Sequence, residues 1–577
     1  MTPRIERRAV PPMMGDWPAQ IHPVLRRIYA ARGVASPADI DHKLVALLSP
    51  QALGGIDRAC ELLETAIRDD ARIVVVGDFD CDGATGTAVA VRGLRLLGAR
   101  HVDYAVPNRM RHGYGLSPAI VEELLPRRPD VLITVDNGVA AHAGVAAAKA
   151  RGMRVIVTDH HLPGSTLPDA DAIVNPNLDG DPFPSKALAG VGVVSYVLLA
   201  LRARLRAKDW FSQRGIPEPD LACLLDLVAL GTVADLVPLD RNNRILVEAG
   251  LRRIRAGRAC AGIVALLACG KRDLSRVVAS DLGFAVGPRI NAAGRLEDMA
   301  LGIECLLTDD ANRAFELAQT LSSINAERRE LQDGMTAQAQ AEVEKWISTR
   351  GADALPYGVV LFDPDWHHGV VGLVASKLKE TLHRPVIACA PADPRTGELK
   401  ASGRSIPGFH LRDALVEVDA RYPGLITRFG GHAMAAGLSL NRADLDTFGT
   451  AFDAVARSRL QPEMLDAVLL TDGELTASDF TLDLAQLLRY AGPWGQVFPE
   501  PVFEGEFTVE SRRVVGERHL KLKLRHPDLP DPIDAIAFNS RTGESPPARL
   551  RAVFQLDVNE WNGAQSLQLL ILHMERA

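Results

Sequence analysis

The chain has 577 residues, more than one hydrophobic core usually organises, so we expect roughly three or four domains. Its hydrophobic content of 47% and charged content of 24% are typical of an ordinary soluble protein. The formal net charge of −7 argues against a nucleic-acid ligand without excluding one, because acids around bound cations add to the negative count while basic residues can still line a groove.

Leader peptides, membrane spans and cysteine-based sites are not expected. Residues 1–20 contain early arginines but no apolar core to follow them, unlike a secretory signal. The longest apolar run, 191–201, is too short to span a bilayer. The seven cysteines are scattered singly, which argues against a structural zinc site and a disulfide framework. We therefore expect a soluble cytoplasmic protein.

From residue 72 to residue 177, short β-branched runs alternate with Ala/Leu-rich helical patterns. This alternation predicts an open, mostly parallel sheet with helices on both faces, and therefore an α/β fold. The expected strands are 73–76, 102–106, 131–135, 155–158 and 172–174.

Polar segments follow the first, third and fourth of these strands. They are GDFDCDG (77–83), DNG (136–138) and DHH (159–161). Ligands of parallel sheets bind just beyond the carboxyl ends of the strands. We therefore expect the acids and histidines of these segments to meet at one edge of the sheet.

The segment GDFDCDG matches the first half of an EF-hand calcium loop, with Asp78, Asp80 and Asp82 at alternate positions before Gly83. The second half does not match, because the position that requires a bidentate Glu is Val89. The preceding run also predicts a strand and not a helix. We interpret the alternation as a strand running out into a loop, so that Asp80 and Asp82 point the same way and Gly83 allows the turn into the next helix.

Further along the chain, 224–239 predicts an apolar helix that carries Asp226 and Asp235, and about 241–308 is helical in pattern. The proline-free stretch 311–347 predicts one long helix, a strut between domains; two helices broken near Gly334 are the alternative.

A second α/β unit is expected to follow, with YGVVLF and PVIACA as strands. Five period-two runs in the last ~110 residues indicate a small β-barrel compatible with an oligonucleotide-binding (OB) fold. The expected domains are an N-terminal segment 1–55, a catalytic domain 56–310 with a helical part 241–310, the connecting helix 311–347, the second α/β domain 348–460 and the barrel 461–577.

Four carboxylates in a single crevice, beside one imidazole, would repel one another strongly without a cation. With two divalent cations, the same groups become ligands, and one carboxylate can bridge both ions. Oxygen ligands with one histidine suit Mn²⁺ or Mg²⁺ better than zinc or calcium. The reaction class that follows is metal-dependent phosphoester hydrolysis. The residues concerned are Asp80, Asp82, Asp136, His160 and Asp235.

The motifs VVGDFDCDGATGTA, ITVDNG, VTDHH and DLVALGTVADLVPL resemble those of the DHH phosphoesterase superfamily. The segments LGFAVGPRINAAGRL, WHHGVVGLVASKL, ASGRS and GGHAMAAG narrow the resemblance to the RecJ family of 5′-to-3′ exonucleases specific for single-stranded DNA. The motifs occur in family order from about residue 55 to the end of the chain. The resemblance implies a DHH catalytic domain, a DHHA1 domain and an OB-fold DNA-binding domain.

The resemblance also implies roles at the predicted centre. Asp136 would bridge the metals, Asp159 would orient the histidines, and His161 would face the scissile phosphate, with a packed core histidine as the alternative. The role of Asp78 is left open. The implied metal ligands are Asp80, Asp82, Asp136, His160 and Asp235.

Further residues would bind DNA. Four residues from three motifs would hold the 5′ phosphate: Arg109, Ser402, Arg404 and His432. For Arg109, a solvated loop residue is an equal alternative. The GPRINAAGR loop would contact the strand backbone through Arg289, Asn291 and Arg295. His367 matches the family, and His368 receives no role. Barrel aromatics that could stack on bases, or simply belong to the core, are Phe538, Phe554 and Trp561.

The function implied is exonucleolytic release of 5′ mononucleotides from single-stranded DNA with two Mn²⁺ or Mg²⁺ ions, in recombination and repair. A monomer is expected, with a single-strand-binding protein and a RecQ-like helicase as partners. One alternative is a phosphoesterase acting on pyrophosphate, a short oligoribonucleotide or a cyclic dinucleotide, which would not need the predicted barrel. Another is a non-catalytic DNA-binding scaffold, which would have lost metal ligands that this chain retains.

Overall fold

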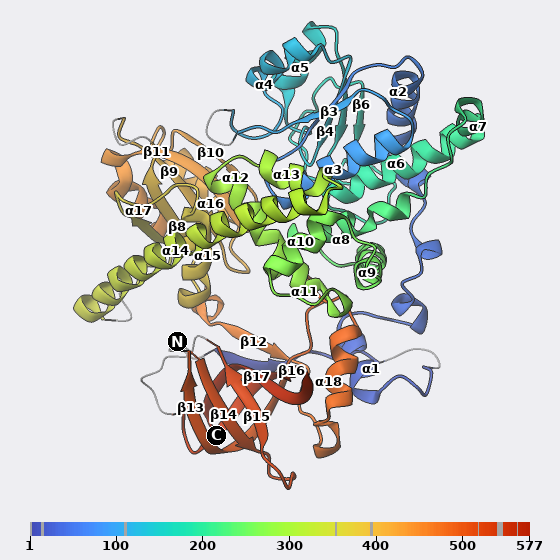
Figure 1. Cartoon of the computed structure of the whole chain (residues 1–577). Coiled ribbons are helices and arrows are strands. Elements are labelled where there is room, and N and C mark those ends of the chain that lie inside the picture. The colour runs from blue at the N-terminus through green and yellow to red at the C-terminus, as the bar shows by residue number, and fades with distance from the viewer. Residues whose placement is uncertain are drawn as a thin grey trace. The chain divides into compact units, whose positions relative to one another are not determined.

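The structure of the chain is a computed structural model. It describes residues 3–12, 17–108, 112–351, 355–392, 396–516, 519–538, 546–561 and 563–577. They form two compact units (Figure 1): a larger one of Arg7–Ser322 with Leu470–Ala577, and a smaller one centred on Ser323–Leu469. The division falls inside helix α14 (Ala311–Arg350), which is continuous through Gly334. Among the described residues, none of the helices combines the length and apolar character needed to cross a bilayer.

The larger unit contains the predicted parallel sheet. Its five strands pair in the order β3-β2-β4-β5-β6, and all neighbouring pairs are parallel. The α/β expectation for this part of the chain is therefore confirmed. The strands are β2 (Ile73–Val76), β3 (Val102–Ala105), β4 (Val131–Val135), β5 (Arg154–Thr158) and β6 (Ala172–Val174).

Alternate residues of each strand point to opposite faces of the sheet, and each face has its own hydrophobic core. Ile73 and Val75 of β2 belong to the core shared with α2, α3 and α6, whereas Val74 and Val76 belong to the core shared with α4 and α5 (Figure 1). Both faces are covered, which explains why the strands are continuous β-branched runs. These helices are α2 (Ile56–Arg68), α3 (Cys81–Leu96), α4 (Pro118–Leu124), α5 (His142–Ala150) and α6 (Gly190–Ala207).

Helices make up most of the rest of the larger unit before α14. Beyond the sheet they are α7 (Trp210–Arg214), α8 (Leu225–Ala234), α9 (Arg241–Arg255), α10 (Ala261–Cys269), α11 (Ala279–Asp281), α12 (Gly287–Leu296) and α13 (Ala300–Leu307). Helix α1 (Pro23–Ala31) precedes the sheet in the sequence. Two short strands, β1 (Arg4–Arg7) and β12 (Val468–Thr471), pair as a separate two-stranded sheet.

Two sequence expectations in this region are wrong. The helix predicted over 224–239 is shorter: α8 ends at Ala234, because Leu236 adopts a left-handed φ of +59° and Pro238 follows. The GPRINAAGR segment is not a loop but helix α12, which a π-helical turn (Leu282–Val286) precedes. Pro288 lies in the first turn of α12, where its fixed φ suits a helix start and its missing N–H is not needed.

The smaller unit contains a five-stranded mixed sheet in the order β10-β11-β9-β8-β7. Only β7 and β8 are parallel, and the other pairs are antiparallel. The two strands predicted here are present as β7 (Val359–Phe362) and β8 (Val386–Pro391). The other elements are β9 (Glu398–Arg404), β10 (Arg428–Gly431), β11 (Ala435–Asn441), α15 (Val371–Leu382), α16 (Leu411–Arg421) and α17 (Leu445–Arg459).

The C-terminal strands close into a barrel in the order β13-β14-β15-β17-β16, with β16 pairing back to β13. All five predicted runs are strands, so the expected small barrel is confirmed. Helix α18 (Leu482–Tyr490) precedes it. The strands are β13 (Phe503–Val515), β14 (His519–Arg525), β15 (Ile533–Ala537), β16 (Arg549–Trp561) and β17 (Ala564–Arg576).

Candidate metal centre

The first two predicted ligands lie where β2 leads into α3. Asp80 is the N-cap of α3, and its carboxylate accepts a hydrogen bond from the Gly83 N–H at 3.0 Å. Asp82 lies in the first turn of the helix. The expected extended alternation is therefore wrong, because the helix begins between the two acids. Gly83 is required for close packing: a Cβ there would lie 2.5 Å from the Asp78 carbonyl oxygen.

The N-terminus of α6 holds the Asp82 carboxylate. The Gly190 N–H donates to Oδ2 at 2.6 Å, and the Val191 N–H donates to Oδ1 at 2.9 Å. N–H groups in the first turn of a helix have no partner within the helix and carry partial positive charge, so they suit an anion. Each carboxylate oxygen keeps a second lone pair, so Asp82 is fixed in place and still able to bind a cation.

Asp136 directly follows β4 and adopts a left-handed φ of +62°, which is uncommon for a residue with a side chain. Its N–H donates to the Thr158 carbonyl at the end of β5 at 3.1 Å. The buried Asn137 amide donates to the carbonyls of Val76 at 3.0 Å and Val135 at 2.9 Å. These contacts fix the Asp136 carboxylate at the ends of the central strands.

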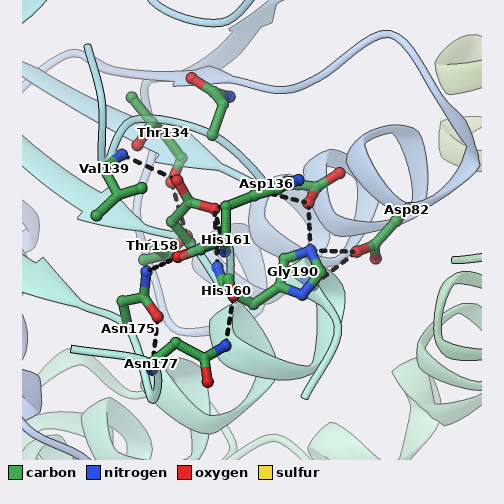
Figure 2. A network of polar contacts seen from close by, with 12 residues as sticks. Asp82, Thr134, Asp136, Val139, Thr158, His160, His161, Asn175, Asn177 and Gly190 are labelled. Carbon is green, nitrogen blue, oxygen red and sulfur yellow. Dashed lines mark hydrogen bonds and ion pairs between the residues drawn. The ribbon is translucent and has the colours of Figure 1, made fainter. Parts of the chain in front are cut away.

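The imidazole of His160 lies among the carboxylates of Asp82, Asp136 and Asp235, and Figure 2 shows the first two beside it. Its Nε2 is 3.0 Å from Asp136 Oδ1, 3.9 Å from Asp82 Oδ2 and 3.5 Å from Asp235 Oδ2. Asp235 reaches this point because it is the C-cap residue of α8. The fold thus brings together predicted ligands at the start of α3 and at the ends of β4, β5 and α8 that are far apart in the sequence.

Asp159 is buried, and hydrogen bonds occupy its carboxylate. Oδ1 accepts from the His161 N–H at 3.1 Å and lies 2.8 Å from His161 Nδ1, while Oδ2 accepts from the Val139 N–H at 2.9 Å. Oδ1 also accepts from the His160 N–H at 2.8 Å. This geometry matches an orienting carboxylate that does not itself bind metal. The His161 side chain is 47% exposed, so it is not the packed core histidine of the alternative interpretation.

The electrostatics of the centre favour a bound positive charge. Burial, followed by the charge of Asp80, raises the pKa of Asp82 to about 7. Burial and neighbouring carboxylates raise the pKa values of Asp136 and Asp235 well above their ordinary range. Burial lowers the pKa of His160 to about 4, which leaves a neutral imidazole with a free lone pair. The carboxylates repel one another, and the neutral imidazole offers a lone pair. A divalent cation bound by these groups would stabilise them.

Potential ligand atoms form three overlapping groups, and within each group the atoms lie within 4.8 Å of one another. The groups are Asp136, His160 and His161; Asp82, His160 and Asp235; and Asp78, Asp80 and Asp136. Among the described residues, Asp136 Oδ1 and His160 Nε2 are buried atoms for which no hydrogen-bond partner is found. Asp136 and His160 are shared between groups, as a site for two adjacent ions requires. The residues therefore fit two Mn²⁺ or Mg²⁺ ions.

Three family models match the chain along its length. The DHH family N-terminal domain matches residues 72–232, the DHHA1 domain residues 355–458, and the RecJ OB domain residues 471–573. The matched regions contain the parallel sheet, the mixed sheet and the barrel in that order.

Relatives match over nearly the whole chain. The single-stranded-DNA-specific exonuclease RecJ of Salmonella typhimurium is 52% identical over 96% of this chain and 96% of its own length. The chain belongs to the RecJ family. RecJ of Escherichia coli is 51% identical over 96% of each chain. The crystal structure of RecJ in complex with Mn²⁺ from Thermus thermophilus has a TM-score of 0.79 and 32% identity, covering 97% of this chain and 76% of that chain.

The DNA contacts implied by the RecJ resemblance are placed as follows. Arg109 lies outside the described residues. The Arg289 guanidinium donates to Ser322 Oγ at 2.9 Å and to the Cys269 carbonyl at 3.2 Å. The Asn291 Oδ1 accepts from the Cys81 N–H at 2.8 Å, so this side chain supports the start of α3 beside the metal ligands. Arg295 is a partly buried residue of α12. Their contacts with a RecJ substrate stay predictions.

In the smaller unit, two residues of the implied RecJ phosphate site are neighbours. Arg404 of β9 donates to Ser402 Oγ at 2.9 Å, and a Cβ on Gly372 in the first turn of α15 would lie 2.9 Å from that Oγ. The exposed His432 accepts a hydrogen bond from the Met434 N–H at 3.3 Å. The structure therefore brings Ser402 and Arg404 together beside a helix N-terminus, a setting that favours anions.

Sequence reasoning missed Gly190 and Asn137 at this RecJ-family centre. A Cβ on Gly190 would lie 2.5 Å from Asp136 Cβ, so only glycine fits there. The signals were available: LAGVGVV places small residues at a helix start, and Asn137 lies inside DNG. Among the barrel aromatics, Phe554 is fully buried and belongs to the core, whereas Phe538 is 54% exposed.

Proposed function

We propose that the protein is an exonuclease specific for single-stranded DNA that uses two Mn²⁺ or Mg²⁺ ions. The observation that carries this proposal is the complete cluster of carboxylates and imidazole at the sheet edge, in a chain that is 52% identical to a RecJ exonuclease over 96% of its length. A scaffold without activity would have no need of acids whose pKa values are raised by burial and by neighbouring carboxylates.

The metal ligands we assign are Asp80, Asp82, Asp136, His160 and Asp235, and Asp136, which belongs to two of the groups of potential ligands, would serve both ions. When bound, the two cations activate water and offset the charge of the phosphodiester. Backbone groups of the protein keep the ligands rigid: N–H groups of the α6 N-terminus fix Asp82, and the end of strand β5 fixes Asp136. Rigid placement of this kind supplies much of the catalytic advantage of a metal site.

His161 is assigned to the substrate phosphate. Its imidazole is 47% exposed, and Asp159 holds it in place through Nδ1 at 2.8 Å. Burial lowers the pKa of His161, but the hydrogen bond with Asp159 and nearby carboxylates raise it to about 9. The ring is therefore cationic at neutral pH and suited to a phosphate oxygen.

We further propose 5′-to-3′ polarity with release of 5′ mononucleotides. Ser402, Arg404 and His432 would hold the terminal 5′ phosphate, and the Ser402–Arg404 hydrogen bond supports this assignment. The exposed face of the barrel would bind the DNA strand farther from the cleaved bond. A role in recombination and repair would place the protein in the cytoplasm, as a monomer working beside a single-strand-binding protein and a RecQ-like helicase.

The test follows release of label from oligonucleotides marked at the 5′ or 3′ end, as single strands and as duplexes, with Mn²⁺ or Mg²⁺ and with chelator. We expect rapid release of 5′ label from single strands only, lost with chelator. Asp136→Asn should abolish release, whereas Asp169→Asn, at a side chain 93% exposed, should match the wild type. Preferential digestion of duplex DNA, or activity that survives chelation, would refute the proposal.

A further inference from the structure

An aromatic side chain, Tyr114, lies at the edge of the metal centre and has no role in the site described so far. The residue is 52% exposed. Its ring meets the ring of His161 edge-on, with centroids 5.9 Å apart, and meets the ring of Phe79 in the same way at 6.0 Å. An aromatic side chain in contact with His161 and open to solvent over half its surface is placed to meet the substrate.

The sheet holds the segment that carries Tyr114. Asn137 Oδ1 accepts from the Leu116 N–H at 3.1 Å, while the same amide is anchored to the strand ends. Gly115 has a left-handed φ of +66°, and a Cβ there would lie 3.0 Å from Asn137 Oδ1. The close approach of backbone and amide depends on glycine. The ring of Tyr114 is therefore fixed relative to the metal ligands.

The hydroxyl of Tyr114 connects the ring to the bridging ligand. It donates to the Asp136 carbonyl at 3.0 Å and lies 3.4 Å from both ring nitrogens of His161. Asp136 has the uncommon left-handed φ of +62°, a conformation that persists only when surrounding contacts determine it. The hydroxyl supplies one of these contacts.

We infer that the ring of Tyr114 stacks on the base of the nucleotide whose phosphate enters the metal centre, while its hydroxyl positions Asp136. The inference rests on the proposed exonuclease function. Stacking on an aromatic face tolerates every base, because every base has a π-face, and so suits a nuclease that degrades any sequence. A base in a duplex is already stacked and paired, and removing it costs energy, so a ring at this point favours unpaired strands.

The test compares an unmodified single strand with strands that carry one abasic nucleotide at the first or second position from the 5′ end. Wild type should process the unmodified strand about ten-fold more efficiently than an abasic one, the effect expected for one lost base–aromatic stack. Tyr114→Leu removes both the ring and the hydroxyl, so it should lose roughly fifty-fold on the unmodified strand and only about five-fold on the abasic one, which brings the ratio to about one.

Tyr114→Phe separates the two roles. It keeps the ring, so the ratio between unmodified and abasic strands should stay at the wild-type value. It removes the hydroxyl, so kcat should fall by about five-fold with KM unchanged, the size expected for one lost hydrogen bond. The matched control is Tyr104→Phe, whose hydroxyl bonds Glu304 away from the centre and whose kinetics should equal the wild type.

A discrimination ratio that Tyr114→Leu leaves at the wild-type value, in a variant with wild-type melting temperature, would overturn the stacking role. A Tyr114→Phe variant with wild-type kcat would overturn the positioning role. These failures are distinct from failure of the proposed function, in which the wild-type protein itself would not degrade single strands in the presence of Mn²⁺.

Discussion

Gly190 is the position where the smallest change should disable the metal centre. It donates its N–H to Asp82 at 2.6 Å, and a Cβ added to it would lie 2.5 Å from Asp136 Cβ and 2.9 Å from Asp136 Oδ1. Carbon atoms in contact prefer about 3.5–4.0 Å. Gly190→Ala therefore requires a displacement of roughly 1 Å between α6, which anchors Asp82, and the end of β4, which carries Asp136.

A misplacement of about 1 Å costs on the order of 100-fold in rate when reacting groups must be held in register. We therefore expect Gly190→Ala to lower kcat on single-stranded DNA roughly 100-fold and to weaken Mn²⁺ binding. The assay is single-turnover cleavage across a Mn²⁺ titration, with thermal melting to verify the fold.

Gly192→Ala is the matched control in the same helix. Its added Cβ would meet only Leu188, with Cδ2 nearest at 3.2 Å, the end of a flexible side chain. Alanine also favours a helix over glycine by about 1 kcal/mol, so this variant should be active and no less stable. A misplaced ligand should cost far more than about three-fold. If Gly190→Ala kept kcat and Mn²⁺ affinity within about three-fold of the control, glycine would not be needed to space the carboxylates of Asp82 and Asp136.

Two further predictions concern ionisable groups. In metal-free protein, Asp159→Asn should lower the pKa of His161 from about 9, because the hydrogen bond and the charge of Asp159 are lost while burial, which lowers this pKa, remains; NMR titration would show it, and a pKa still near 9 would contradict the assignment. Glu64 is buried, but hydrogen bonds from Lys208, Arg204 and a third basic residue bring its pKa from 4.5 to about 2. Glu64→Gln should thus cost about 1–3 kcal/mol of unfolding free energy above pH 4.5, a difference that shrinks to zero as the pH falls to about 2. Denaturant unfolding at several pH values measures it, and a difference independent of pH would contradict the ion-pair account.

The parallel sheet could be predicted from sequence because its strands are buried on both faces. Runs such as VLITV are apolar throughout, so β4 is found at the predicted residues 131–135. The order β3-β2-β4-β5-β6 could not be predicted from such runs, since it depends on how the crossover helices pack.

The acids and histidines of the site could be predicted for a related reason. Parallel strands place their carboxyl ends at one edge, so Asp136 and His160 had to converge. The contacts that hold them could not be predicted, because they are backbone groups that become neighbours only in the folded chain. Gly190 is one example, and the Asn291 amide is another: its bond to the Cys81 N–H joins α12 to α3.

The central claim is that acids from α3, β4 and α8 and a histidine after β5 hold two catalytic metal ions. The most direct measurement is anomalous diffraction at the manganese edge from crystals of this protein grown with Mn²⁺. The account predicts two peaks, both within coordination distance of the Asp136 carboxylate, one beside His160 and Asp235. No peak at the ends of β4 and β5, or a single peak that Asp136 does not contact, would contradict it.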